Sequence, residues 1–192
     1  MRIVKKPEER RAEMIAAAAR LFAEQGFVRT SVAEIVNAVD VAKGLFYYYF
    51  TTKDEMVKAV VEGCCSCVGA IADAIADSEG TALEKLDRLT GHDIFRQYFT
   101  QPLLKDLCLP QHTALYADMC DRLYEHLSPA VERIAAQALR ESGRSDAAAR
   151  QMVGVGLYGI LMMARKGEMS MQDVHSMTRR LIDAAKGEAC SA

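Results

Sequence analysis

Four residues between positions 43 and 48 could bind an anion from the surface of one short helix. Lys43 supplies a cation, Tyr47 and Tyr48 supply phenol hydroxyls, and Gly44 leaves the backbone bare. Residues three or four positions apart share a helix face, so Lys43 lies beside Tyr47 and Gly44 beside Tyr48. A lysine neutralises phosphate, a phenol hydroxyl donates to phosphate oxygens, and a glycine permits close approach. The pattern therefore favours contact with a nucleic acid.

The other side of the same segment is apolar. Ala42, Phe46, Tyr49 and Phe50 recur at positions i, i+4, i+7 and i+8, which predicts one buried stripe on a helix. An alternative is an aromatic strand, or a small cluster below a loop, formed by Phe46 to Phe50. In that case Lys43 is an ordinary solvated charge.

The helix that must support this segment is predicted at Pro7 to Gln25, because proline suits a first turn and Gly26 suits a helix end. Its apolar residues fall three and four positions apart and predict a second buried stripe. They are Ile15, Ala18, Ala19 and Phe22.

Two capping boxes predict the starts of the second and fourth helices. In each, a hydroxyl and a carboxylate three residues apart satisfy amides that a helix start leaves unpaired: Ser31 with Glu34, and Thr52 with Glu55. Between them, residues 39–41 predict a tight break, so the third helix covers 42 to about 48. Three short helices thus fit before residue 52.

The rest of the chain also repeats its apolar residues with helical spacing, and we find no convincing alternating run, so the fold class is all-α. Pro102, Pro110 and Pro129 fall at proposed helix starts. The pattern leaves open whether Pro129 separates two helices or kinks one. The predicted helices are 52–77, 81–100, 102–108, 111–127, 129–142, 146–166 and 170–187.

Composition limits the classes of protein. The chain has 192 residues, of which 51% are hydrophobic and 26% charged, as in globular proteins. Residues 1–53 carry nine Lys or Arg against six Asp or Glu, whereas the rest carries fifteen against twenty. The basic end is the one expected to approach phosphate. With no secretory signal and no uncharged run of membrane length, we expect a cytoplasmic protein that does not contact membranes.

One long stretch resembles a known family. The segments Thr30-Ser31-Val32-Ala33-Glu34-Ile35-Val36, Val41-Ala42-Lys43-Gly44-Leu45-Phe46-Tyr47-Tyr48-Tyr49-Phe50 and Lys53-Asp54-Glu55 are similar to the TetR-family helix-turn-helix signature. The resemblance covers roughly the first 60 residues. It implies a three-helix DNA-binding domain at 1–51 whose third helix enters the major groove, joined to a helical effector-binding and dimerisation domain at 52–192.

The resemblance also implies a DNA-contacting set and a function. The set is Ser31, Lys43, Gly44, Leu45, Tyr47, Tyr48 and Lys53. The implied function is a repressor that binds a near-palindromic double-stranded DNA operator as a homodimer and is released by a small molecule. Asp40 stands where the family usually has glycine and Ala42 where it often has a capping hydroxyl. Aspartate tolerates a left-handed backbone, while the lost cap costs on the order of 1 kcal/mol.

The last two predicted helices are candidates for the dimer interface. Residues 152–164 carry no charge, so this helix needs cover on nearly every side. A second copy of the chain, related by a two-fold axis, would cover the exposed side of this helix. The alternative is that the helix lies at the centre of a monomeric bundle. The candidate interface residues are Gly156, Gly159, Ile160, Met163, Val174, Met177 and Leu181.

The middle helices are expected to hold the effector, whose apolar or aromatic character is suggested by the candidate wall. Each of these residues is equally compatible with plain core. They are Cys64, Cys67, Phe95, Tyr98, Phe99, Tyr116, Met119, Cys120 and Tyr158.

Rival functions have weaker support. Cys64 and Cys67 form a C-x-x-C pair within a predicted helix, without a second close ligand pair, so we expect no metal and no cofactor. The alternative is a helical ligand-binding module, or a thiol or metal sensor, that does not bind DNA. A helical enzyme is a further alternative, but metalloprotease, phosphate-loop and dinucleotide motifs are absent, so we expect no catalytic residues.

Overall fold

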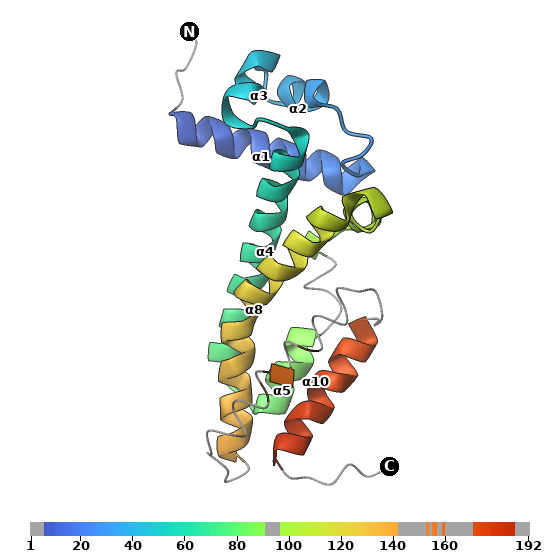
Figure 1. The fold of residues 1–192 in the computed structure, drawn as a ribbon. Helices are drawn as coiled ribbons and strands as arrows, with labels where there is room; N and C mark the ends of the chain where they lie inside the picture. Colours follow the sequence, from blue (N-terminus) through green and yellow to red (C-terminus); the bar gives the residue numbers. More distant parts are fainter. Residues whose placement is uncertain are drawn as a thin grey trace. The chain divides into compact units, whose positions relative to one another are not determined.

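The computed structural model describes residues 6–90, 97–141, 153, 155–156, 159 and 171–186. Every regular element in these ranges is a helix, which confirms the all-α prediction (Figure 1). The elements are α1 (Pro7–Gln25), α2 (Val32–Ala38), α3 (Lys43–Tyr49), α4 (Lys53–Asp77), α5 (Ala82–Thr90), α7 (Gln101–Leu107), the 3₁₀ helix η1 (Pro110–His112), α8 (Thr113–Glu141) and α10 (Met171–Lys186).

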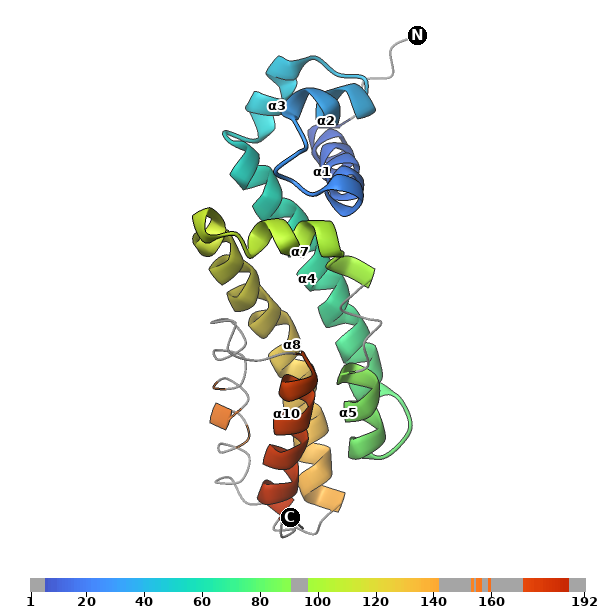
Figure 2. The same ribbon diagram turned by 90° about the vertical axis from the view of Figure 1, so that its right-hand side faces the viewer.

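The chain forms two compact units. The N-terminal unit contains residues 1–64 and 96–119, and the C-terminal unit contains 65–95 and 120–192. Helix α7 belongs to the N-terminal unit because it packs against α1 (Figure 2). This packing division differs from the boundary after residue 51, which stays a prediction about functional domains.

Large side chains fill the core of the N-terminal unit. Helix α1 buries Met14, Ala17, Ala18 and Phe22. The predicted stripe was therefore right for Ala18 and Phe22, but Ile15 and Ala19 are only half-buried. The buried face is rotated slightly toward Met14, whose long side chain fills more of the interior.

Helix α4 runs through both units and buries a residue at nearly every turn. It is the one helix in the described ranges that is long and apolar enough to cross a membrane, with a mean hydropathy of 1.6 over a window that is 39% buried. The sequence search for uncharged runs overlooked it because the window tolerates isolated charges. One such helix is weak support for a membrane span, since core helices of soluble proteins pass the same test.

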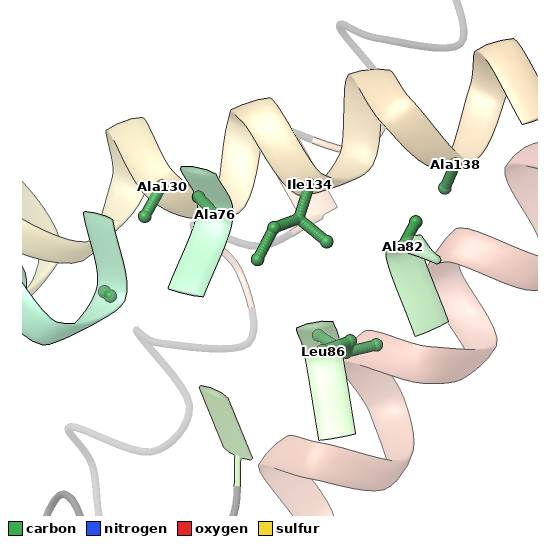
Figure 3. Packing of buried hydrophobic residues seen from close by; sticks show 7 residues of the cluster. Ala76, Ala82, Leu86, Ala130, Ile134 and Ala138 are labelled. Atoms are coloured by element: carbon green, nitrogen blue, oxygen red, sulfur yellow. The ribbon is translucent and has the colours of Figure 1, made fainter. Parts of the chain in front are cut away.

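An alanine-rich seam joins α4, α5 and α8 in the C-terminal unit (Figure 3). Its buried members are Ala72, Ala76, Ala82, Leu86, Ala130, Ile134 and Ala138. Lys85 is buried beside the seam, where its Nζ donates to the Ala76 carbonyl at 2.9 Å and to Gln137 Oε1 at 2.7 Å.

Pro129 lies inside α8, so the two helices predicted at 111–127 and 129–142 are one helix preceded by η1. The sequence left open whether Pro129 separates two helices or lies within one, and the structure places it within one. Ala130, Ile134 and Ala138 continue one buried stripe beyond the proline. We attribute the continuity to this packing, which offsets the hydrogen bond that proline cannot donate.

Candidate nucleic-acid interface

The start of α2 has the predicted capping box. The Glu34 amide donates to Ser31 Oγ at 3.2 Å, and the Ser31 amide donates to Glu34 Oε2 at 2.7 Å. Hydrogen bonds to the Glu34 carboxylate, first from the Ser31 backbone and then from the side chains of Ser31 and Gln25, hold the pKa of Glu34 below its ordinary value. Ser31 is exposed, so its surroundings stay open to a partner.

The turn between α2 and α3 uses a left-handed residue. Asp40 has φ of 51°, the one positive φ outside glycine among the described residues. Aspartate tolerates this conformation, as its sequence position predicted. Ala42 follows at the N-cap of α3 without a side-chain hydrogen bond, so the cap is missing as expected. Ala42 is exposed, and its predicted burial was wrong because it precedes the helix.

Helix α3 separates an aromatic buried face from a polar exposed one. Phe46 and Phe50 are fully buried, with ring centroids 5.5 Å apart. The Arg11 guanidinium of α1 lies 4.9 Å from the Phe50 ring centroid. The helical geometry excludes the strand alternative for this segment.

The exposed face of α3 carries the predicted polar set. Lys43 and Gly44 are exposed, and Tyr47 and Tyr48 expose 52% and 75% of their surface. Leu45 is half-buried. We call Lys43, Gly44, Tyr47 and Tyr48 the α3 polar face.

Nothing in the fold requires glycine at position 44. A Cβ built on Gly44 meets no atom within 4 Å, and its φ is not positive. Glycine inside a helix is destabilising by about 1 kcal/mol relative to alanine. Since the fold of the free protein does not require Gly44, the glycine is compatible with a role in close approach by a binding partner.

Lys53 has a different environment from the one its predicted phosphate contact suggested. Its Nζ donates to the backbone carbonyls of Phe27 at 2.9 Å, Thr30 at 3.2 Å and Val28 at 3.5 Å. The ammonium therefore supports the turn between α1 and α2 from within the protein. Whether it also contacts phosphate stays a prediction.

The start of α4 only partly follows its predicted capping box. The Glu55 amide donates to Thr52 Oγ1 at 3.1 Å, as expected. The Glu55 carboxylate instead accepts from the Thr51 amide at 2.7 Å, one residue earlier than the pattern suggested.

Asp106 contacts the turn between α1 and α2, and no sequence pattern indicated this contact. Its Oδ2 accepts a hydrogen bond of 2.8 Å from the Val28 amide, although the two residues are 78 positions apart. Nothing local in α7 marks this contact, because capping and periodicity report only on neighbours along the chain.

The structure brings together only some of the predicted effector-binding residues. Cys64 Sγ lies 3.5 Å from the Tyr98 carbonyl oxygen. Phe99 and Met119 are buried, Tyr116 and Cys120 are half-buried, and Cys67 is exposed. Phe95 and Tyr158 lie outside the described residues. Within the described ranges, no three His, Cys, Asp or Glu residues are placed to hold a metal ion.

The predicted dimer residues are described in part. A Cβ on Gly156 would lie 2.5 Å from Leu181 Cδ2, so Gly156 allows its helical segment to approach α10 within one chain. Gly159 meets nothing within 4 Å, and Met177 is 41% exposed. Ile160, Met163 and the side chain of Val174 lie outside the described residues.

Helices α2 and α3, the tight turn between them and the α3 polar face define the helix-turn-helix class of DNA-binding protein. Residues 14–60 match the family described as "Bacterial regulatory proteins, tetR family". The N-terminal part of this chain is therefore similar to the DNA-binding region of that family of transcriptional regulators.

Two curated relatives share the N-terminal region. The HTH-type transcriptional repressor KstR2 of Mycobacterium tuberculosis is 33% identical over 88 residues, covering 46% of this chain and 44% of the relative. The HTH-type transcriptional regulator HbdR of Aromatoleum sp. is 44% identical over 50 residues, covering 26% and 22%. The chain thus matches less than half the length of these relatives.

Solved structures extend the similarity to the whole fold. The structure of RolR in complex with resorcinol has a TM-score of 0.65 and 20% sequence identity, covering 97% of this chain and 95% of that one. RolR without ligand gives a TM-score of 0.62 at 20% identity, covering 94% and 97%. At this identity the likeness shows the fold alone.

Proposed function

We propose that this protein is a non-enzymatic transcriptional repressor that binds a near-palindromic DNA operator with the α3 polar face. The observation that carries the proposal is that Lys43, Gly44, Tyr47 and Tyr48 are exposed on one helix whose other side is anchored by Phe46. A major groove about 12 Å wide admits such a helix. The named functions of the relatives support the same class.

We further propose a cytoplasmic homodimer. Two recognition helices about 34–36 Å apart fit successive faces of the major groove. Val155 is 68% exposed and Met177 is 41% exposed, so these two positions offer apolar surface to a second copy. Met177 is one of the predicted interface residues, and Val155 directly precedes another, Gly156. The exposure of these two side chains supports the predicted dimer interface.

The proposed effector is a small apolar or aromatic molecule. The sulfur and aromatic side chains at Cys64, Tyr98 and Phe99 suit such a ligand. RolR holds resorcinol, so a fold of this kind accommodates a small aromatic ring. A ligand that prefers a non-binding arrangement by 1–3 kcal/mol changes DNA affinity about 5- to 150-fold.

A salt titration tests the DNA-binding proposal. The probe is a duplex selected by the wild-type protein from a randomised pool. Lys43→Ala is expected to weaken binding and to reduce the slope of log affinity against log salt by about one for each recognition helix. Arg140→Ala removes an exposed cation from α8 and is the matched control, expected to leave the slope unchanged.

Gly44→Ala sharpens the test because its two effects have opposite signs. The free protein is expected to gain up to about 1 kcal/mol of stability, since the new methyl group meets no atom and alanine favours a helix. Affinity for the selected duplex is expected to fall about tenfold, equivalent to about 1.4 kcal/mol. If Gly44→Ala is more stable but binds the duplex as tightly as the wild type, the DNA does not approach the protein closely at position 44.

A sensor without DNA binding is the second candidate function. The observation that favours it is the absence of a side-chain cap at Ala42, which weakens the start of α3. The same selection separates the two, because such a sensor enriches no duplex while its fold and thermal unfolding remain normal.

A further inference from the structure

The turn that leads from α1 into the helix-turn-helix is held from two sides by opposite charges. On one side, Lys53 Nζ donates to the carbonyls of Phe27 and Thr30 at 2.9 and 3.2 Å. On another, the Asp106 carboxylate accepts from the Val28 amide at 2.8 Å. A charged acceptor makes a stronger hydrogen bond than a neutral one.

The conformation and surroundings of Gly26 also indicate that α7 lies close to this turn. Its φ of 81° favours glycine, and a Cβ at this position would overlap Asp106 Oδ2 and lie 3.2 Å from the Pro102 carbonyl oxygen. The turn and α7 are therefore so close that no larger residue fits between them. Two observations, a hydrogen bond and a steric requirement, thus place the Asp106 carboxylate against the turn.

Neighbouring contacts fix α7 in place. Before α7, Thr100 Oγ1 donates to the Ala23 carbonyl of α1 at 3.4 Å. Beyond it, the His112 ring packs edge-on against Phe27 with centroids 4.8 Å apart. Contacts on both sides of α7 therefore hold the helix that carries Asp106 against α1 and the turn.

We propose that Asp106 is a positioning residue for the DNA-binding surface, acting from α7 through the Val28 amide. The turn it holds ends at Thr30, directly before the Ser31 cap of α2. Fixing this turn fixes the direction in which α2, and then α3, leave α1. Without the contact, only a fraction of molecules present α3 correctly, and apparent affinity falls by that fraction. The inference rests on the proposed DNA-binding function.

The test compares Asp106→Ala with Asp106→Asn in the full-length protein. Asparagine removes the charge but keeps a side-chain oxygen that can accept from Val28, whereas alanine removes the acceptor. With the selected duplex as probe, Asp106→Ala is expected to lose about tenfold in affinity by the same factor at every salt concentration, because a population effect removes no phosphate contact. Asp106→Asn is expected to stay within about threefold of the wild type.

Amide hydrogen exchange gives a readout that needs no DNA. In the wild type, the Val28 amide is expected to exchange slowly although its side chain is exposed. In Asp106→Ala, exchange across residues 26–31 is expected to speed up, while α5 keeps its protection. Asp106→Asn is expected to retain slow exchange at Val28.

Several outcomes overturn the proposal. Fast exchange at Val28 in the wild type overturns it even if the alanine variant does not fold. Undiminished affinity of Asp106→Ala overturns it, and so does weakening in both variants equally, which would indicate a charge effect. If the wild type binds no selected duplex, the DNA-binding function fails while the exchange data still decide whether Asp106 holds the turn.

Discussion

Four phenylalanines lie in the core of the N-terminal unit, whereas one core cluster of the C-terminal unit joins α4, α5 and α8 mainly through alanines. Phe22, Phe27, Phe46 and Phe50 are all at most 1% exposed. In the alanine-rich seam, Leu86 and Ile134 are the two large side chains among the buried members that the structure describes, and Ile75, Leu89 and Leu127 pack against it partly buried.

This difference concerns how strongly each core specifies its geometry. Large aromatic side chains interlock, so few arrangements of α1, α2 and α3 fill the interior without voids. Alanines let helices approach closely, but their methyl groups are too small to interlock and fix one helix position relative to another. A fixed α3 suits a surface that must match a DNA groove, and we therefore expect the N-terminal unit to tolerate core changes less well.

The largest predicted effect breaks the aromatic core. Phe46→Ala is expected to lower the free energy of unfolding by about 3–5 kcal/mol, because it removes a fully buried ring. Denaturant unfolding measures the loss, and faster amide exchange in α2 and α3 locates it. Tyr48→Ala on the opposite face is the control, expected within about 0.5 kcal/mol of the wild type. A cost below about 1 kcal/mol for Phe46→Ala would remove the contrast between the two cores.

The next effect tests the alanine-rich seam. Ile134→Ala is expected to cost about 2–4 kcal/mol, since it deletes one of the two large buried side chains of the seam and leaves a cavity. Unfolding monitored with exchange in α5 and α8 measures it, and the exposed neighbour Glu132→Ala is the control. If the small residues close the cavity, the cost falls toward the lower limit. If Ile134→Ala costs more than Phe46→Ala, the expected contrast between the two cores is wrong.

Local patterns explain what could be predicted from the sequence. The bounds of α1 agree with the prediction because Pro7 and Gly26 mark its ends. The Ser31 and Glu34 pair forms its box because capping involves residues only three positions apart. The α3 polar face followed from spacing together with family resemblance, and the resemblance added which residues face DNA.

Contacts between distant residues explain what could not. Lys53 was predicted to contact phosphate because of its place in the motif. Its ammonium instead donates hydrogen bonds to the carbonyl oxygens of Phe27 and Val28, about 25 positions earlier in the sequence. Asp106 contacts Val28 across 78 positions, and no periodicity reports such a contact. The local rule for proline could not decide whether Pro129 separates two helices or lies within one, because the answer depends on the tertiary packing of Ala130 and Ile134.

The smallest predicted effect concerns the capping box, a motif that occurs at a helix start in each unit. The start of α5 has a capping box that the sequence prediction missed, in which the Thr81 amide donates to Glu84 Oε2 at 2.8 Å and the Glu84 amide to Thr81 Oγ1 at 3.3 Å. Ser31→Ala and Thr81→Ala are each expected to cost about 1 kcal/mol, because a cap is a local interaction that the surrounding core does not alter. Denaturant unfolding at neutral pH measures both.

The pH dependence of the two boxes is expected to agree as well. Backbone hydrogen bonds, from Ser31 and Thr81 respectively, lower the pKa values of Glu34 and Glu84 from 4.5. A carboxyl whose folded pKa is lowered stabilises the fold above its unfolded pKa, and this contribution disappears as pH falls through the folded value. Glu34→Gln and Glu84→Gln should therefore each flatten the acid side of the stability profile below about pH 4.5. If only one variant does so, the difference between the cores extends to the helix ends, and the caps are not independent of the packing behind them.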